Sequence, residues 1–116
     1  MKRIDAIIRP ERLAAVREAF DEAIDELGNP GITVSEVKGH GAQRGITEQW
    51  RGREYRVEYL SKVWILMVVA DDVAEKAIEL ILDNAATGEV GDGKVFVSTV
   101  DEVIRVRTRE RGEVAT

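Results

Sequence analysis

Residues 87–97 carry the most specific chemical signal in the chain, with the sequence Thr-Gly-Glu-Val-Gly-Asp-Gly-Lys-Val-Phe-Val. Three glycines and one lysine fall within the seven residues from Gly88 to Lys94. Because glycine lacks Cβ, successive backbone N–H groups can turn toward one anion, and a lysine at the end of such a loop adds a mobile positive charge. The segment therefore predicts a phosphate cradle, and with it a protein that binds nucleotides.

The same segment fits the first seven positions of the P-loop motif, but two features argue against that motif. The eighth position is Val95, so no hydroxyl is available for magnesium. A P-loop follows a strand and opens a helix, whereas here a helical pattern precedes the loop and a β-branched run follows it. The alternative is that the segment binds no ligand. Gly88 would then end the preceding helix, and residues 91–93 would form an ordinary turn.

Two arginines follow the glycine segment, Arg105 and Arg107, on a strand predicted for residues 100–106. Residues two apart on a strand point the same way, so the two guanidinium groups would repel each other unless an anion lay between them. Phosphate is a good bidentate partner for arginine. The pair therefore favours an anion site, and the alternative is a solvated polar face paired with surface carboxylates.

Gln43 and Lys62 are further candidates for binding small ligands. A neutral amide oxygen such as that of Gln43 can ligate magnesium beside phosphates, and Lys62 can meet a carboxylate; either can also be a simple surface residue. The chain shows no Ser-His-Asp arrangement and no convincing pair of acid and base. Hydrolysis remains open, because magnesium, lysine and arginine alone can position a phosphoryl group.

The composition narrows the classes of protein. A chain of 116 residues with 44% apolar residues suits one domain, residues 1–116. There is no cysteine and only one histidine, His40, which excludes a thiol nucleophile, a zinc–thiolate site and a two-histidine metal site within one chain. A net charge of −5 argues against a general nucleic-acid binder. Neither a membrane-spanning run nor a signal peptide is expected, so the predicted location is cytoplasmic.

Hydrophobic periodicity predicts the secondary structure. Strands are expected over residues 4–8, 32–38, 63–70, 95–97 and 100–106, and helices over residues 10–27 and 71–88. The predicted helical core positions are Leu13, Val16, Phe20, Ile24 and Leu27 in the first helix and Val73, Ala77, Ile78, Ile81 and Leu82 in the second. Asp71 or Asp72 is expected to cap the second helix, and the charged tail, residues 108–116, is expected to be loose.

This order predicts a ferredoxin-like βαββαβ sandwich of the α+β class, with an antiparallel sheet and both helices on one face. The central strand is apolar on both sides, with Trp64 and Leu66 opposite Ile65 and Met67. The helices can cover only one of these sides. Copies of the same chain are the simplest cover for the other side.

Residues 39–58 lie between the two halves and show no clear period. A stretch of this length without a pattern is unusual in a compact domain and tends to be functional or mobile. We therefore predict a long loop that is functional or mobile, and the alternative is a plain hairpin with an irregular tip.

Taken together, these features resemble the P-II nitrogen-regulatory signal-transduction proteins over nearly the whole length. The matching segments are residues 1–10, 33–41 and 51–55, then Thr87-x3-Gly91-Asp92-Gly93-Lys94-Val95-Phe96-Val97-x2-Val100, and finally Val103-Ile104-Arg105-Val106-Arg107-Thr108. The last two segments are highly specific in combination.

The resemblance implies a homotrimer of ferredoxin-like subunits that is not an enzyme. Members of the family bind ATP or ADP in the clefts between subunits, bind 2-oxoglutarate beside ATP through Mg²⁺, and regulate nitrogen assimilation by docking the long loop on targets. An ammonium transporter and/or glutamine synthetase is the implied partner, which allows association with a membrane through a transporter but no direct insertion. The alternatives are a slow ATPase or acylphosphatase-like hydrolase on this fold, and a trimeric scaffold without ligands.

By matching position, the resemblance also implies the site residues. The nucleotide would be held by Thr33, Gly41, Ala42, Gln43, Val68, Gly91, Asp92, Gly93, Lys94, Arg105 and Arg107. The 2-oxoglutarate site would be formed by Gln43, Arg44, Gly45 and Lys62, with Gln43 on the Mg²⁺ that ATP carries. The two arginines would reach the phosphates across a subunit interface.

Some positions depart from the family pattern. Trp50 and Arg53 change the surface of the long loop, and Leu66 replaces a common glutamate near the nucleotide. Tyr55 matches the tyrosine that a uridylyltransferase-type enzyme modifies in some members.

Overall fold

The structure is a computed structural model that describes residues 1–40, 46–50, 53–57 and 59–116. The elements run in the order β1 (Lys2–Ile8), 3-10 helix η1 (Pro10–Arg12), α1 (Leu13–Glu22), α2 (Ile24–Leu27), β2 (Thr33–Gly39), β3 (Ile46–Trp50), β4 (Arg53–Val57), β5 (Leu60–Val69), α3 (Asp71–Ala85), β6 (Gly93–Thr99) and 3-10 helix η2 (Glu113–Ala115).

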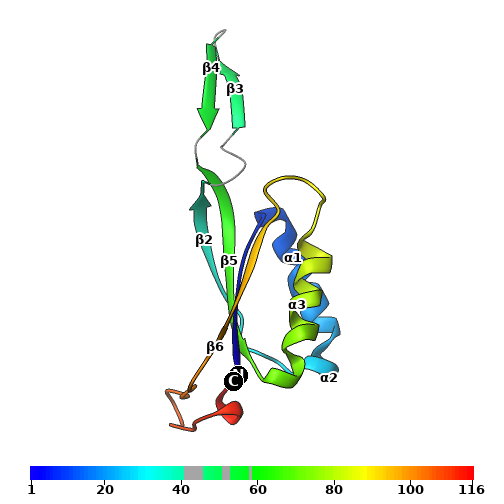
Figure 1. Cartoon of the computed structure of the whole chain (residues 1–116), viewed down its shortest axis with the longest axis vertical. Coiled ribbons are helices and arrows are strands. Elements are labelled where there is room, and N and C mark those ends of the chain that lie inside the picture. The colour runs from blue at the N-terminus through cyan, green and yellow to red at the C-terminus, as the bar shows by residue number, and fades with distance from the viewer. Residues whose placement is uncertain (41–45, 51–52, 58) are drawn as a thin grey trace.

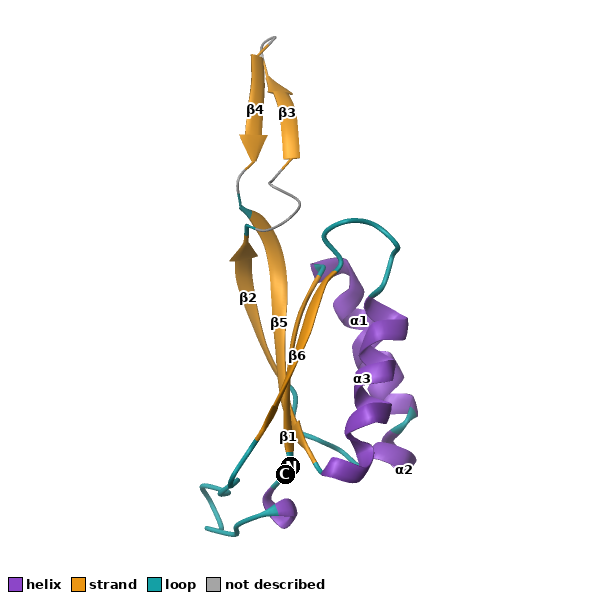
Figure 2. Ribbon diagram, in the orientation of Figure 1, coloured by secondary structure: helices purple, strands orange, loops and turns teal. Residues whose placement is uncertain are grey.

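Within the described residues, four strands form one antiparallel sheet in the order β2-β5-β1-β6. Helices α1 and α3 lie side by side on one face of this sheet (Figures 1 and 2). This arrangement is the ferredoxin-like α+β sandwich, so the predicted fold class is confirmed.

Strands β3 and β4 form a separate two-stranded sheet within residues 39–58. Their antiparallel register places Ile46 opposite Val57 and Trp50 opposite Arg53. The alternative of a hairpin therefore describes the backbone of this segment better than an irregular loop does. A two-stranded sheet of this kind is only marginally stable in water by itself.

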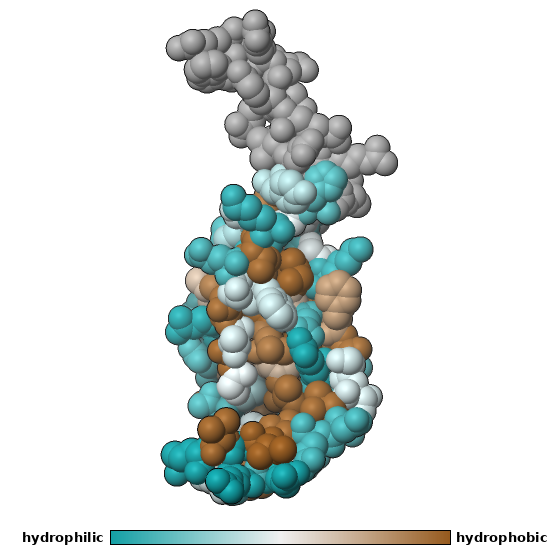
Figure 3. Space-filling model, turned by 90° about the vertical axis from the view of Figure 1, so that its left-hand side faces the viewer, coloured by the Kyte–Doolittle hydropathy of each residue, from teal (hydrophilic) through white to brown (hydrophobic). Residues whose placement is uncertain are grey.

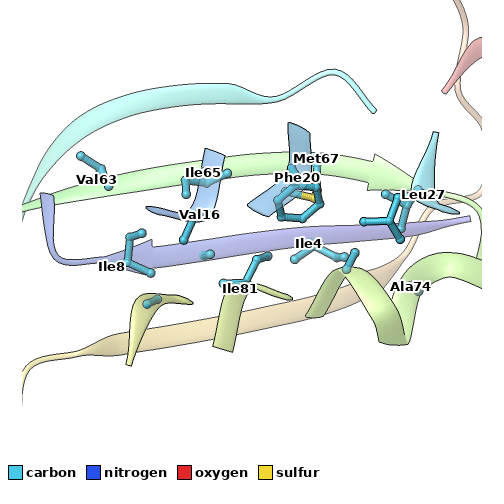
Figure 4. Close-up of a cluster of buried hydrophobic side chains, with 14 residues drawn as sticks. Ile4, Ile8, Val16, Phe20, Leu27, Val63, Ile65, Met67, Ala74 and Ile81 are labelled. Atoms are coloured by element: carbon cyan, nitrogen blue, oxygen red, sulfur yellow. The ribbon is translucent and has the colours of Figure 1, made fainter. Parts of the chain in front are cut away.

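The core lies between the sheet and the helices (Figure 4). Alternation along β1 and β5 turns every second side chain toward the helices, where Ile4, Ile65 and Met67 are at most 1% exposed. From the helices, Val16 and Ile81 are buried to a similar degree. Burial of such aliphatic side chains stabilises the fold by about 1.5–3 kcal/mol each.

The helical core differs from the prediction at two positions. The first helix is interrupted at Ala23, so α2 is offset from α1; Ile24 is 45% exposed while Leu27 remains buried. In α3 the buried positions are Ala74, Ala77, Ile81 and Ala85, a spacing of three and four residues. Leu82 lies beside this line and is 51% exposed, so its assignment to the core was wrong.

The ends of α3 also differ from the prediction. The helix begins after Ala70 without a side-chain cap, and the carboxylate of Asp71 pairs with the amino group of Met1 at 2.9 Å instead. The helix ends at Ala85, and Gly88 follows three residues later with a φ of 87°. Gly88 therefore shapes the next loop and does not end the helix.

The strand predicted over residues 100–106 is wrong. Strand β6 ends at Thr99 because its partner β1 begins at Lys2, which lies opposite Thr99. Beyond this point the amide of Val100 still bonds to the carbonyl of Met1, at 3.1 Å. No other described strand lies beside residues 101–106, so the chain leaves the sheet.

Among the residues that the structure describes, no element covers the second face of the sheet, which is called the uncovered face below. Trp64, Leu66 and Val68 point away from the helices and are half-buried, and Phe96 on the same face is 55% exposed. Figure 3 views the molecule from this side and shows apolar side chains along the middle of the face, flanked by hydrophilic ones. We expected β5 to be covered on both faces. Within a single chain, only the face toward the helices is covered by the described residues.

Candidate functional site

Residues 87–94, called the glycine loop below, connect α3 to β6. Gly88, Gly91 and Gly93 all have a positive φ, of 87°, 98° and 105°. This region of φ is costly for residues with a Cβ, so the three glycines set the path of the loop. A helix precedes the loop and a strand follows it, which is the order expected from the sequence and the reverse of a P-loop.

Asp92 organises the loop from within. Its carboxylate accepts hydrogen bonds from the backbone N–H groups of Thr87 and Gly88, at 2.8 and 2.9 Å, and from the hydroxyl of Thr87. Arg9 donates to the same carboxylate through Nε at 3.0 Å. The bonds from Thr87, followed by the contact with Arg9, hold the pKa of Asp92 well below its usual range. A carboxylate bound in this way positions the loop, and it would repel a phosphate that touched it directly.

Two cations hold the middle of the loop. Arg9 donates through Nη2 to the carbonyl of Val90 at 2.8 Å, and the Lys62 ammonium donates to the carbonyl of Gly91. In a trans peptide the C=O and N–H groups point in opposite directions. The N–H groups of Gly91 and Asp92 therefore point away from Arg9 and Lys62.

Lys62 lies at the start of β5 in a partly buried position. Burial lowers its pKa, and the nearby charge of Arg9 lowers it further. The side chain thus links the central strand to the glycine loop through Gly91. The same ammonium was predicted to meet a carboxylate of a small ligand, and nothing in the described residues tests that role.

Gly93 is fixed by close packing as well as by its φ. A Cβ at this position would lie 1.7 Å from the backbone oxygen of Ile7 in the neighbouring strand. Only glycine allows the loop to join β6 at this point in the ladder. Gly88 differs, because a Cβ there would meet no atom within 4 Å.

Lys94 is the second residue of β6 and is exposed. It lies opposite Ile7, which in turn lies opposite Trp64. Because side chains alternate along a strand, Lys94 projects on the uncovered face of the sheet. A cation is therefore present where the glycine loop meets this apolar face.

Thr33 and Val68 share the uncovered face with Lys62 and Lys94. Thr33 lies opposite Leu66, and Val68 lies opposite Arg3. Thr33 and Lys94 are on the two edge strands, roughly 14 Å apart if three strand spacings separate them. The fold therefore places these predicted residues on one surface without bringing them into contact.

Arg105 and Arg107 lie beyond the other end of β6. This strand runs from Gly93 to Thr99, which corresponds to roughly 20 Å. Figure 2 shows the glycine loop and the segment after β6 at opposite ends of the sheet. The prediction that the arginines lie side by side on a strand is wrong, and within one chain they do not meet the glycine loop.

Arg105 is engaged in its own segment. Its guanidinium donates to the Glu110 carboxylate at 2.7 Å and to the carbonyl of Val114 at 2.8 Å. Arg107 is exposed and has no ion-pair partner among the described residues. Residues 109–116 thus fold back on the preceding chain, which differs from the loose tail that the sequence suggested.

Sequence reasoning missed the residues that hold these groups in place, Arg9, Thr87 and Glu110. Arg9 is 83 residues from Asp92, and no local pattern connects them. Thr87 is part of the same glycine-rich segment as Asp92, and this closeness in sequence could have indicated their contact. Glu110 lies five residues after Arg105, but the strand predicted there gave no reason to pair them.

The remaining predicted residues belong to the segment between β2 and β5. Residues 41–45, and with them Gly41, Ala42, Gln43, Arg44 and Gly45, fall outside the described residues. Tyr55 belongs to β4 and lies opposite Glu48 in the hairpin ladder. In the described ranges no group of three or more His, Cys, Asp or Glu side chains is arranged to hold a metal ion. Among the same residues, no helix has the length and apolar character needed to cross a bilayer.

Comparison with known proteins agrees with this architecture. The family model described as Nitrogen regulatory protein P-II matches residues 1–110. The chain is 54% identical over 112 residues to Nitrogen regulatory protein P-II of Rhizobium meliloti, covering 97% of this chain and 96% of the relative. It is 50% identical over 115 residues to P-II 1 of Escherichia coli, covering 99% of each.

An archaeal relative, Nitrogen regulatory protein P-II 2 of Methanothermobacter thermautotrophicus, is 50% identical over 115 residues, with 99% of this chain and 96% of the relative covered. These relatives are named as regulatory proteins and not as enzymes. The chain belongs to the P-II family of nitrogen regulatory proteins.

Proposed function

We propose that this protein is a trimeric sensor of ATP, ADP and 2-oxoglutarate that regulates nitrogen assimilation by binding other proteins. Family membership supports the role in nitrogen regulation. The proposal also names the ligands, the trimer and the partners, and the arrangement of the site supports these.

The observation that carries the proposal is the separation of the glycine loop from Arg105 at the two ends of β6. Neither half makes a complete phosphate site. Copies of the chain packed head to tail through their uncovered faces would bring the loop of one to the arginines of the next, and such contacts close into rings. A trimer would contain three of these combined sites.

The glycine loop suits a polyphosphate in its chemistry. Its carbonyls at Val90 and Gly91 are held by Arg9 and Lys62, so the N–H groups of Gly91 and Asp92 are turned to the other side. Two successive N–H groups with a lysine after them can bind an anion. Lys94 would supply charge to the phosphates, and Thr33 and the backbone near Val68 would contact the adenine.

The second ligand, 2-oxoglutarate, carries two carboxylates and would be repelled by a nearby triphosphate. Magnesium between them removes this repulsion. Gln43 would supply a neutral oxygen to the Mg²⁺ that ATP carries, and Lys62 would balance the far carboxylate, with Arg44 and Gly45 beside it. Lys62 also bonds to Gly91, so the two ligand sites would share one side chain.

The hairpin of β3 and β4 is the proposed contact with target proteins. A two-stranded hairpin has little stability of its own, so its conformation can respond to ligands and to a partner. An ammonium transporter and/or glutamine synthetase is the proposed target, and Tyr55 in β4 is a candidate for uridylylation. The protein would act in the cytoplasm, and at the membrane only through a transporter.

The test is calorimetric titration of ATP and ADP into the wild-type protein, Lys94→Ala and Lys76→Ala. Lys94→Ala should weaken ATP binding by tenfold or more, since a hydrogen bond to a charged group contributes about 1.5–3 kcal/mol. Lys76 lies on α3, is 51% exposed and pairs with Glu26, so its removal should leave ATP binding unchanged. Equal affinity in all three proteins, or rapid turnover of ATP at millimolar concentration, would refute the proposal and favour an ATPase or a hydrolase.

A further inference from the structure

Residues 102–116, called the C-terminal arm below, fold into a compact hairpin-like segment. The amide of Arg105 bonds to the carbonyl of Glu110 at 2.9 Å, and the amide of Gly112 bonds to the carbonyl of Val103 at 3.0 Å. A second ion pair joins Arg111 to Glu102 across the arm. The turn between the two sides contains Arg109, which has a φ of 62°. The arm therefore has a defined conformation within a single chain.

This conformation places a carboxylate on Arg105. The Nη1 atom of Arg105 lies 2.7 Å from Oε1 of Glu110, while Nη2 is 2.8 Å from the carbonyl oxygen of Val114. Carboxylate and phosphate oxygens use the same donors of a guanidinium. Glu110 thus occupies donor capacity of Arg105 that a phosphate would use.

The pair is exposed enough to be exchanged. The side chains of Arg105 and Glu110 are 38% and 40% accessible, so water screens their attraction. Removing Glu110 from Arg105 would therefore cost little, and a polyphosphate of higher charge could replace it. The arm would lower the affinity for the ligand without closing the site.

We propose that Glu110 is a positioning residue that competes with phosphate for Arg105 and so sets the affinity of the anion site. The inference rests on the proposed function, because it assigns Arg105 to the phosphates. In the free protein Glu110 holds the guanidinium and neutralises it. In the bound protein the phosphate takes its place, and the Glu110 side chain turns to solvent.

The experiment compares Glu110→Gln with Glu113→Gln. Both changes remove one negative charge from the same arm, and the Glu113 side chain has no ion pair among the described residues. Titrations with ATP and with inorganic tripolyphosphate should show about two- to fivefold tighter binding for Glu110→Gln, the range expected for an exposed ion pair. Glu113→Gln should bind both ligands as the wild type does.

A double-mutant cycle separates competition from a general effect on the arm. If Glu110 acts through Arg105, Glu110→Gln should have no effect on tripolyphosphate binding when Arg105→Gln is already present. A purely structural role predicts the opposite sign, since a disrupted arm would lower both the unfolding temperature and the affinity. Unchanged or weaker binding by Glu110→Gln, or an equal gain by Glu113→Gln, would overturn the inference.

The same titrations distinguish failure of the role proposed for Glu110 from failure of the proposed nucleotide site. If the wild type binds neither ATP nor tripolyphosphate, both proposals are wrong. If the wild type binds ATP and Lys94→Ala does not, while Glu110→Gln leaves the affinity unchanged, the nucleotide site stands and the role of Glu110 is wrong.

Discussion

Arg9 and Asp92 form a 3.0 Å ion pair that ties the chain after β1 to the glycine loop before β6. The same carboxylate binds Thr87 and Gly88, and the same guanidinium binds the carbonyl of Val90. The loop is therefore held from both sides before any ligand arrives. A preformed loop loses less conformational freedom on binding, which favours affinity.

Asp92 should make the stability of the protein depend on pH. The bonds from Thr87, and then the contact with Arg9, hold its pKa far below the ordinary value of 3.8. When the pH falls below about 5, the unfolded chain begins to bind a proton that the native carboxylate does not, so stability declines. Asp92→Asn should unfold at a lower temperature at neutral pH and lose less stability on acidification.

Thermal unfolding between about pH 7 and pH 3 tests this expectation. Asp83→Asn is the matched control, because Asp83 is exposed on α3 and has no ion pair among the described residues. An acid profile of Asp92→Asn that parallels the wild type would show that Asp92 does not anchor the loop.

Two glycines of the loop should respond very differently to alanine. In Gly93→Ala the new Cβ would collide with the backbone oxygen of Ile7, so we expect a loss of at least about 2 kcal/mol in the free energy of unfolding. In Gly88→Ala only the positive φ is unfavourable, at a cost of about 1 kcal/mol. Urea unfolding measures both values, and equal losses would contradict the packing at Gly93.

Much of this fold could be predicted from the sequence, because apolar residues alternate along β1, form a continuous run in β5 and recur with a helical period in α3. The failures have specific causes. The strand expected around Arg105 does not form because β1 provides no residue for it to pair with, and Leu82 is exposed because the core line of α3 runs through alanines. A local hydrophobic pattern does not predict the length of a partner strand. It also does not show which alanines of a helix are buried in the core.

The site was predictable in its residue types and less so in its contacts. The spacing of the glycines and Lys94 predicts an anion-binding loop. The role of Asp92 depends on Arg9 from the other end of the chain, and the state of Arg105 depends on how the arm folds around Glu110. The first is a contact over 83 residues without a signature in the sequence, and the second depends on a local turn that the strand predicted there excluded.

The uncovered sheet face should drive self-association. Light scattering at micromolar concentration should give about three times the chain mass of 12.9 kDa. Leu66→Asp places a charge in the half-buried centre of this face and should produce a folded monomer, because burying an unpaired charge in an interface is costly. Leu82→Asp alters an exposed residue of α3 and should remain a trimer. A monomeric wild type would refute the assembly and the combined site.

Binding of 2-oxoglutarate should depend on the γ-phosphate. ADP lacks the oxygens that complete the shell of the metal, so 2-oxoglutarate should bind tightly to the Mg-ATP form and poorly to the Mg-ADP form. Because coupling is reciprocal, 2-oxoglutarate should tighten Mg-ATP binding by the same factor. Calorimetry of both forms, and of Gln43→Ala with Mg-ATP, tests this. Equal affinity in all three would rule out metal bridging through Gln43.

The central claim is that the phosphate site combines the glycine loop of one chain with Arg105 of the next. The most direct test is ATP binding by a co-expressed mixture of Lys94→Ala and Arg105→Ala chains, each of which should bind weakly alone. In mixed trimers about one quarter of the sites would join an intact loop to an intact arginine, and those sites should bind ATP with wild-type affinity. A mixture of Lys94→Ala chains with chains that carry both Lys94→Ala and Arg105→Ala has no intact loop, so it should recover no ATP binding. If the first mixture also recovers nothing, the site does not span two chains.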